Sequence, residues 1–289
     1  MAIAQRVVLA ALLSAAALGA QAQPMTDQER RDAIGKLHWE KGGTHKLADS
    51  SSTLVLPDDH VMLNGADAER FEALIGNGGI TKIEAVTVDR AQEQIIFQSI
   101  REGYVGVDDW ADVDAKQMLD QVTEKTEQAN SVRVKNGFAE MHLSGWLKEP
   151  TLDRDSNTVY WAFALDEGQK KIVNTKALRL GRDGFELMTW VGDAANYKAS
   201  GGDLAVVLSA YNFDPGHRYA DHTSGDKIAA YSIAGLVATI AGVKFAKLAA
   251  AGGLLLLFKK FGVIIVAALA GVAVKAKSFF ARKKGGNAA

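Results

Sequence analysis

The polar residues best suited to chemistry are concentrated between Gly216 and Asp226, in the sequence Gly-His-Arg-Tyr-Ala-Asp-His-Thr-Ser-Gly-Asp. The imidazoles of His217 and His222 and the carboxylates of Asp221 and Asp226 are groups that ligate zinc and similar ions. Their spacing matches no established ligand pattern, such as two His one helical turn apart. The segment therefore has two interpretations. The sequence favours a structural role, and the alternative is the site of a periplasmic metal-dependent hydrolase.

In the structural interpretation the segment forms a collar at a membrane surface. Asp226 can cap a helix formed by the apolar run that begins at Ile228, because a carboxylate stabilises the positive end of a helix. Arg218, Tyr219 and Lys227 are side chains that suit lipid headgroups. Only Lys227 separates Asp226 from the apolar run. We therefore expect the folded domain to stand directly on the membrane.

A second cluster consists of Asp108, Asp109, Asp112 and Asp114. These residues could be read as a calcium loop or as paired acid/base carboxylates. The cluster lacks the Gly and the Glu that an EF-hand loop has at its sixth and twelfth positions. Acidic residues directly before a helix stabilise its positive end, and Asp114 and Gln117 have the spacing of a capping box. The cluster therefore predicts the start of a helix.

Several enzyme classes lack their signatures in this chain. No Gly-x-Ser-x-Gly elbow, phosphate-binding loop or His-Glu-x-x-His motif occurs in the sequence. The chain has no cysteine, which excludes thiol catalysis and thiolate metal sites. We therefore expect no catalytic residue, no cofactor and no resident metal, and the sequence favours a non-enzymatic protein.

The charge distribution divides the chain into two parts. Residues 23–226 contain all 34 acidic residues and 22 Lys and Arg, a formal charge of −12. Residues 227–289 contain ten Lys and Arg, no acidic residue, and the apolar runs Ile228–Val243 and Val263–Val274. This division predicts an acidic water-soluble domain followed by a basic membrane anchor. A domain of −12 repels nucleic acid, so we expect no nucleic-acid partner.

Residues 1–22 have the layout of a secretory signal peptide. Arg6 precedes the apolar run Val7–Gly19, and Ala20-Gln21-Ala22 supplies small residues for cleavage. The apolar run is shorter than the ~20 residues that a spanning helix needs, which disfavours the alternative of an uncleaved anchor. We expect residues 23–226 to be the periplasmic domain of a bacterial inner-membrane protein and residues 227–289 to be its anchor.

The soluble part predicts an α+β fold, with a mainly antiparallel sheet, a few packed helices, and one or two transmembrane helices after it. Strands and helices occur in blocks without regular βαβ alternation. A hairpin is expected around Pro57-Asp58-Asp59, and an Asp-Gly turn is expected to join the last two long strands. The expected strands are Thr53–Leu56, Val61–Leu63, 95–100, His142–Lys148, Thr158–Leu165, Lys171–Leu180 and Phe185–Val191. The expected helices follow Asn64, start near Asp114, and run from Asp203 to Ala210.

The tail allows two arrangements. Ile228–Val243, extended past Lys244 and Lys247, reaches the length of a span, because lysine stems can snorkel. Lys259-Lys260 interrupts the second apolar run at a position that is costly inside a bilayer. Either the chain forms a two-span hairpin with these lysines at the cytoplasmic turn, or one span is followed by a basic amphipathic segment, residues 248–284, on the inner leaflet.

As an ordered set, several short motifs resemble a family of uncharacterised bacterial membrane-anchored proteins that is known as a domain of unknown function. The resemblance implies a signal peptide, a periplasmic domain and a C-terminal anchor, and it carries no established activity. We expect an envelope scaffold or sensor whose partners are the lipid bilayer and another envelope protein. The motifs are Gly103-Tyr104-Val105, Asp108-Asp109, Gly145-Trp146, Pro150, Asp153, Trp161, Asn174, Leu180-Gly181-Arg182, Gly184, Gly216 to Tyr219, Asp221, Asp226 and Ala229.

Overall fold

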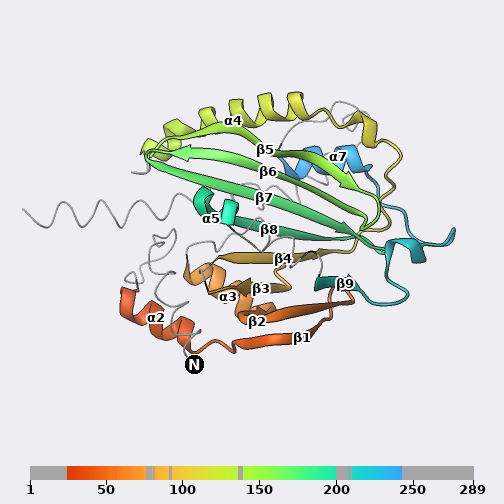
Figure 1. Ribbon diagram of the computed structural model, residues 1–289, viewed down its shortest axis with the longest axis horizontal. Helices are drawn as coiled ribbons and strands as arrows, with labels where there is room; N and C mark the ends of the chain where they lie inside the picture. The colour runs from red at the N-terminus through yellow and green to blue at the C-terminus, as the bar shows by residue number, and fades with distance from the viewer. Residues whose placement is uncertain are drawn as a thin grey trace, which may run out of the picture.

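The described part of the chain forms a nine-stranded antiparallel sheet with helices packed on it, as the computed structural model in Figure 1 shows. The structure describes residues 25–75, 80, 82–90, 93–135, 139–199, 208 and 210–242. The strand order is β1-β2-β3-β4-β8-β7-β6-β5, and β9 pairs with β2. The strands are β1 (Glu40–Leu47), β2 (Ser52–Asn64), β3 (Ala85–Val88), β4 (Gln94–Ile100), β5 (Met141–Asp153), β6 (Thr158–Glu167), β7 (Lys170–Leu180), β8 (Phe185–Asp193) and β9 (Tyr211–Phe213). The helices are α2 (Asp27–Gly35), α3 (Gly65–Leu74), α4 (Ala115–Lys135), α5 (Ala194–Ala199) and α7 (Ile233–Ile240), with the 3-10 turns η2 (Trp110–Asp112) and η3 (Tyr219–Asp221).

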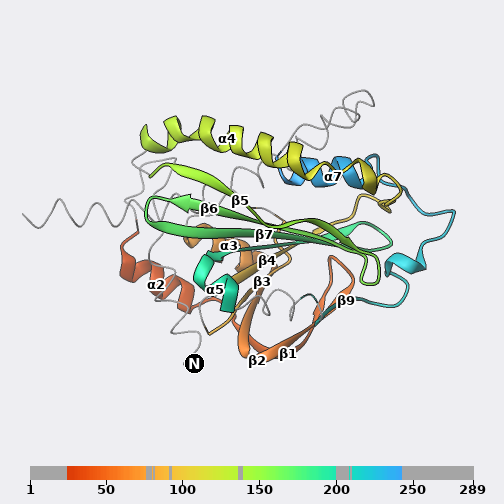
Figure 2. The ribbon, with the colours of Figure 1, turned by 45° about the horizontal axis from the view of Figure 1, so that its top comes forward.

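This architecture confirms the expected α+β class with a mainly antiparallel sheet. Successive side chains of a strand point to opposite faces of the sheet, and both faces carry buried apolar side chains. One face is covered by α2 and α3 over β2–β4 and by α4 and α7 over β6–β8, and Figure 2 shows α4 and α7 side by side above the strands. The other face gathers apolar side chains from both halves of the sheet, together with α5.

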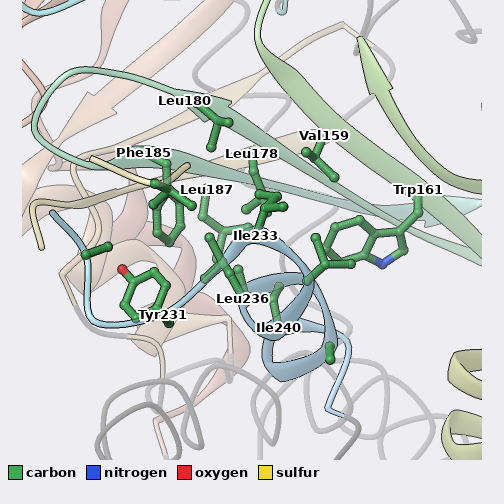
Figure 3. Close-up of a cluster of buried hydrophobic side chains, with 14 of the residues drawn as sticks. Val159, Trp161, Leu178, Leu180, Phe185, Leu187, Tyr231, Ile233, Leu236 and Ile240 are labelled. Carbon is green, nitrogen blue, oxygen red and sulfur yellow. The ribbon is translucent and has the colours of Figure 1, made fainter. Parts of the chain in front are cut away.

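Helix α7 lies in the hydrophobic core, within the apolar run that predicts a membrane span. All eight of its residues are buried, and Ile233 and Leu236 are 0% exposed. Figure 3 shows these two side chains against Leu178 and Leu187 of the sheet. An eight-residue helix is about 12 Å long, whereas the hydrocarbon core of a bilayer is about 30 Å thick. The expected span beginning at Ile228 is therefore corrected, because the chain through Gly242 is part of the folded domain.

The start of α7 also differs from the prediction. Ser232 caps the helix, and its hydroxyl accepts a hydrogen bond from the N–H of Gly235 at 3.4 Å. Asp226, the predicted cap, pairs with Arg182 instead. Within the described ranges, no helix is both long and apolar enough to cross a membrane. The expected signal peptide and the rest of the expected anchor, residues 243–289, lie outside those ranges.

Two local predictions around the site are confirmed. Helix α4 begins at Ala115, and the N–H of Gln117 donates to the Asp114 carboxylate at 2.8 Å, as the capping spacing predicts. Strands β7 and β8 form the expected hairpin through Asp183-Gly184. Gly184 has φ +153°, and a Cβ there would lie 1.9 Å from the carbonyl oxygen of Ile100, so this turn requires glycine.

The expected hairpin at Pro57 is wrong. Residues Ser52–Asn64 form one strand, and its pairing with β1 is interrupted where Pro57–His60 lie opposite Gly42. Proline lacks the N–H that a regular ladder needs, and a bulge removes that need. Gly42 permits the bulge, because a Cβ at this position would lie 2.0 Å from the Pro57 carbonyl oxygen. Most of the helix expected from Asp203 to Ala210 lies outside the described residues.

Candidate functional site

The polar segment singled out from the sequence runs along one end of the sheet as a strap, defined here as residues Gly216–Ala229. Its backbone is held on two sides. The N–H of Arg182, in the β7–β8 turn, donates to the carbonyl of His217 at 2.9 Å. The N–H of Tyr104 donates to the carbonyl of Lys227 at 2.8 Å, within a parallel β-bridge between Tyr104 and the residue after Lys227. The strap is therefore part of the domain and leads directly to α7.

An ion pair between Arg182 and Asp226 fixes the strap. Arg182 donates from Nε at 2.8 Å and from its terminal nitrogen at 2.7 Å, one bond to each carboxylate oxygen of Asp226. The N–H of Thr223 also donates to Asp226, at 2.7 Å. Arg182 and this N–H hold the pKa of Asp226 well below its usual range. Because the guanidinium and the carboxylate match in shape, the pair fixes direction as well as distance.

Aromatic rings fasten the same segment. The ring of Tyr104 lies between Tyr219, with centroids 4.5 Å apart, and His222, with centroids 3.8 Å apart. The Tyr219 hydroxyl donates to the carbonyl of Val105 at 3.0 Å. Burial and the neighbouring Tyr104 raise the pKa of Tyr219. His222 Nδ1 lies 3.2 Å from Asp226 without the alignment of a hydrogen bond.

The four predicted metal-site residues do not converge on one point. His217 Nδ1 lies 2.9 Å from Asp183, whereas Asp226 pairs with Arg182. Asp221 accepts the N–H groups of Gly216 at 2.8 Å and Arg218 at 3.0 Å, so it closes a tight turn. In the part of the chain that the structure describes, no group of three or more His, Asp or Glu could hold a metal ion. The arrangement does not support a metal-dependent hydrolase at the strap.

The predicted collar residues separate into two kinds. Tyr219 stacks on Tyr104 and its hydroxyl donates to the Val105 carbonyl, so its ring is turned toward the domain. Arg218 and Lys227 are exposed, and the neighbouring Ile228 is 59% exposed, which is unusual for a large apolar side chain. Contact between these three residues and a membrane stays a prediction. In the acidic cluster, Asp114 caps α4, and the backbone of Asp109 accepts the N–H of Asp112 at 2.9 Å in η2.

Gly103 sets the distance between the strap and the loop before α4. Its φ is +116°, and a Cβ would lie 2.6 Å from the Lys227 carbonyl oxygen. Gly103→Ala is therefore expected to lower the free energy of unfolding by about 1–3 kcal/mol, through backbone strain and displacement of the strap. It should also speed tryptic cleavage after Arg218 and Lys227. The control is Gly106→Ala, where the added Cβ meets no atom within 4 Å. Equal urea unfolding and equal cleavage of the two variants would contradict the tight contact.

A second candidate site, which the sequence reasoning missed, lies between α4 and the sheet. It is a cavity of about 70 Å³ that is lined by α4, β5, β6, β7 and the end of α7. Its wall is mainly apolar and includes Val122, Phe163 and Ile240. Lys176 and Trp161 are directly opposite each other on β7 and β6, so both point to this helix-covered face.

Five residues with polar side chains line this cavity, Lys125, Thr126, Trp161, Asn174 and Lys176, and the donors of Trp161 and Lys176 are deeply buried. Lys176 is 5% exposed and donates to the Thr189 hydroxyl at 2.8 Å. Burial lowers the pKa of Lys176 to about 7. Trp161 is 0% exposed, and within the described part of the chain its indole N–H has no hydrogen-bond partner. The one sign of this cavity in the sequence is that Lys176 shares a face of its strand with the apolar residues Leu178 and Leu180.

Away from the strap and the cavity, two carboxylic acids, Glu84 and Glu186, are also buried. Glu186 is 0% exposed and Glu84 is 5% exposed. The Glu84 carboxylate accepts the N–H of Ser50 at 2.8 Å, and the Tyr211 hydroxyl donates to Glu186 at 3.4 Å. Burial and the neighbouring Glu84 carboxyl raise the pKa of Glu186 well above its usual range. One proton shared between the two acids would satisfy the buried oxygen that each leaves without a donor.

No curated protein matches this chain. A solved structure with a weak similarity is the solution structure of cyanobacterial PsbP (CyanoP) from Synechocystis sp. PCC 6803, at 10% identity and a TM-score of 0.35, covering 69% of this chain and 98% of that chain. A family model described as "Protein of unknown function (DUF2167)" matches residues 39–270, which include the strap, the cavity and α7. The chain therefore belongs to the DUF2167 family of proteins of unknown function.

Proposed function

We propose that this protein is a non-enzymatic scaffold or sensor of the bacterial cell envelope. In this proposal the folded domain through Gly242 lies in the periplasm, and residues 243–289 hold it at the inner membrane. Its partners are the lipid bilayer and another envelope protein. The observation that carries the proposal is the burial of α7 in the folded domain, together with the sequence that follows Gly242, which is apolar and basic and has no acidic residue.

The use of the polar residues supports binding over catalysis. The side chains that could have formed an active site at the strap are paired to one another or to the backbone in a way that fixes a segment. Arg182 and Asp226 form a two-bond ion pair, and Asp221 closes a turn. Polar side chains held in this way suit the fixed surface of a scaffold, whereas a hydrolase needs a nucleophile or a metal-bound water within reach of substrate.

The position of α7 also changes the proposed anchor. The two-span hairpin required its first span to begin near Ile228, and this part of the chain is in the domain. The run Phe261–Val274 remains, with Lys259-Lys260 before it and Lys275 after it. Its 14 residues would measure about 21 Å as a helix, so snorkelling lysines would have to complete a single crossing of a ~30 Å core. We propose this single span, with the C-terminal basic residues in the cytoplasm, in accordance with the positive-inside rule.

A truncation after Gly242 tests the anchor. The truncated protein is expected to move from the membrane fraction to the soluble periplasmic fraction, with an unchanged thermal unfolding transition. A control that removes only residues 278–289 keeps the apolar run and should stay in the membrane fraction. Alkaline phosphatase, which is active only outside the cytoplasm, should be active when it is fused after Gly242. A truncated protein that stays with the membrane would contradict the anchor, and an inactive fusion would contradict the periplasmic placement.

A further inference from the structure

We infer that the cavity between α4 and the β6–β7 strands is a binding site for a small monocarboxylate with a short apolar chain, held by Lys176 and the indole N–H of Trp161. This site goes beyond the proposed envelope function and does not depend on it. Failure of the test below would leave the anchor proposal untouched.

The charge of the cavity selects an anion. Two lysines contribute to its lining, Lys176 from β7 and Lys125 from α4, and no Asp or Glu does so among the described residues. The Lys125 ammonium donates to the carbonyl of Gly242 at the rim. Among the residues that the structure describes, no carboxylate pairs with Lys176, and its burial lowers its pKa. A buried ammonium without a counter-ion is costly, so an anion that enters the cavity supplies the missing charge.

The hydrogen-bonding groups select an acceptor. The Lys176 ammonium has three N–H donors, and its bond to Thr189 uses one of them. The indole of Trp161 has one N–H, which has no hydrogen-bond partner among the described residues. Lys176 and Trp161 lie on adjacent strands at paired positions, so a single group can receive both donors. A carboxylate has two oxygens that accept hydrogen bonds and cannot donate when ionised.

The remaining wall selects the body of the ligand. Most of the remaining lining is apolar and consists of Val122, Leu143, Phe163, Leu165 and Ile240. The volume of about 70 Å³ suits a few methylene groups beside the carboxylate and is too small for a long acyl chain. Butyrate therefore serves as the probe.

The experiment uses the full chain in mild detergent, with ¹⁵N in its Trp residues. Butyrate is expected to shift the indole N–H resonance of Trp161, which is identified by its loss in Trp161→Phe. Lys176→Met, which keeps the side-chain length without the charge, should weaken butyrate binding at least tenfold. The control is Lys170→Met, on the exposed end of the same strand, which should bind as the unchanged protein does.

Two further measurements make the inference falsifiable. Butyrate affinity should fall between pH 6 and pH 8.5, because Lys176 has a pKa of about 7 and loses its charge in this range. Lys125, the other charged group of the lining, donates to the Gly242 carbonyl at the rim. Butylamine and butanol, which match the apolar body without the anion, should not shift the Trp161 resonance. The inference is overturned if butyrate leaves this resonance unmoved, if Lys176→Met binds butyrate unchanged, or if butylamine binds equally well.

Discussion

Replacing Leu236 by Ala is expected to lower the free energy of unfolding by about 2–5 kcal/mol, the usual cost of deleting a fully buried leucine side chain. Leu236 is 0% exposed on α7 and packs in the cluster that contains Leu187 and Trp161. A helix in a bilayer would respond differently, because lipid surrounds a leucine there and the loss would not reach the sheet. Urea unfolding of the full chain in mild detergent, followed by tryptophan fluorescence, measures the difference.

The matched control for this experiment is Ile228→Ala. Ile228 belongs to the same uncharged apolar run of the sequence, but it is 59% exposed. Its replacement should change the free energy of unfolding by less than about 0.5 kcal/mol, as for most surface positions. If the two variants unfold alike, the packing of α7 on the sheet is not part of the folded core, and a membrane span beginning at Ile228 becomes tenable again.

The contrast between Leu236 and Ile228 also explains why the sequence misplaces the anchor. Apolar residues are required both by a protein core and by a bilayer, so a run of sixteen uncharged residues does not by itself distinguish them. The prediction completed a span by adding residues past Lys244 and Lys247. The structure instead uses part of the run as an eight-residue helix that packs on strands β6–β8, and these strands lie at least forty residues earlier in the chain.

Local signals were more informative where they rested on short-range geometry. Asp114 and Gln117 predict the start of α4 because a cap involves residues three apart, and Asp183-Gly184 predicts a hairpin because the turn requires a positive φ. Pro57 misled because the partner that permits the bulge, Gly42, lies on another strand. The turn residues therefore predicted the hairpin at Asp183-Gly184 correctly, but not the bulge at Pro57, which depends on Gly42 of another strand.

The candidate sites show the same limit. The sequence identifies the strap as a polar cluster, but the partners that decide its role, Arg182 and Tyr104, lie dozens of residues away. The cavity gives still less signal, because Lys176 and Trp161 become neighbours only through strand pairing. A lysine within a strand is ordinarily exposed, so its burial depends on α4 and α7 covering that face.

Glu186→Gln is expected to make the protein more stable than the unchanged chain at pH 7–8 and to remove part of the decline of its stability with pH. The physical reason is the proton on the buried acid pair. Burial and Glu84 raise the pKa of Glu186 above its ordinary value of 4.5. Below that value both the folded and the unfolded chain hold the proton. As the pH rises, the unfolded chain releases it while the folded chain keeps it, so the free energy of unfolding falls until the pH passes the folded-state pKa.

The size of this effect follows from proton linkage. One proton retained by the folded chain alone lowers the free energy of unfolding by about 1.4 kcal/mol for each pH unit between the two pKa values. Gln has nearly the same shape as the protonated acid, and its amide can donate to the Glu84 oxygen that has no partner. The variant therefore keeps the hydrogen bond and loses the dependence on that proton.

The measurement is urea unfolding of Glu186→Gln and of the unchanged full chain at pH 5, 6, 7 and 8. The difference between the two curves reports the Glu84–Glu186 pair, because the carboxylates with lowered pKa, such as Asp214 and Asp226, are common to both chains and lose their contribution only in acid, as the pH falls below their ordinary value of 3.8. Glu149→Gln, at an exposed position of β5, is the matched control and should follow the unchanged chain at every pH. A difference that stays constant from pH 5 to pH 8 would mean that Glu186 is ionised in the folded protein, and the shared proton would then have to be abandoned.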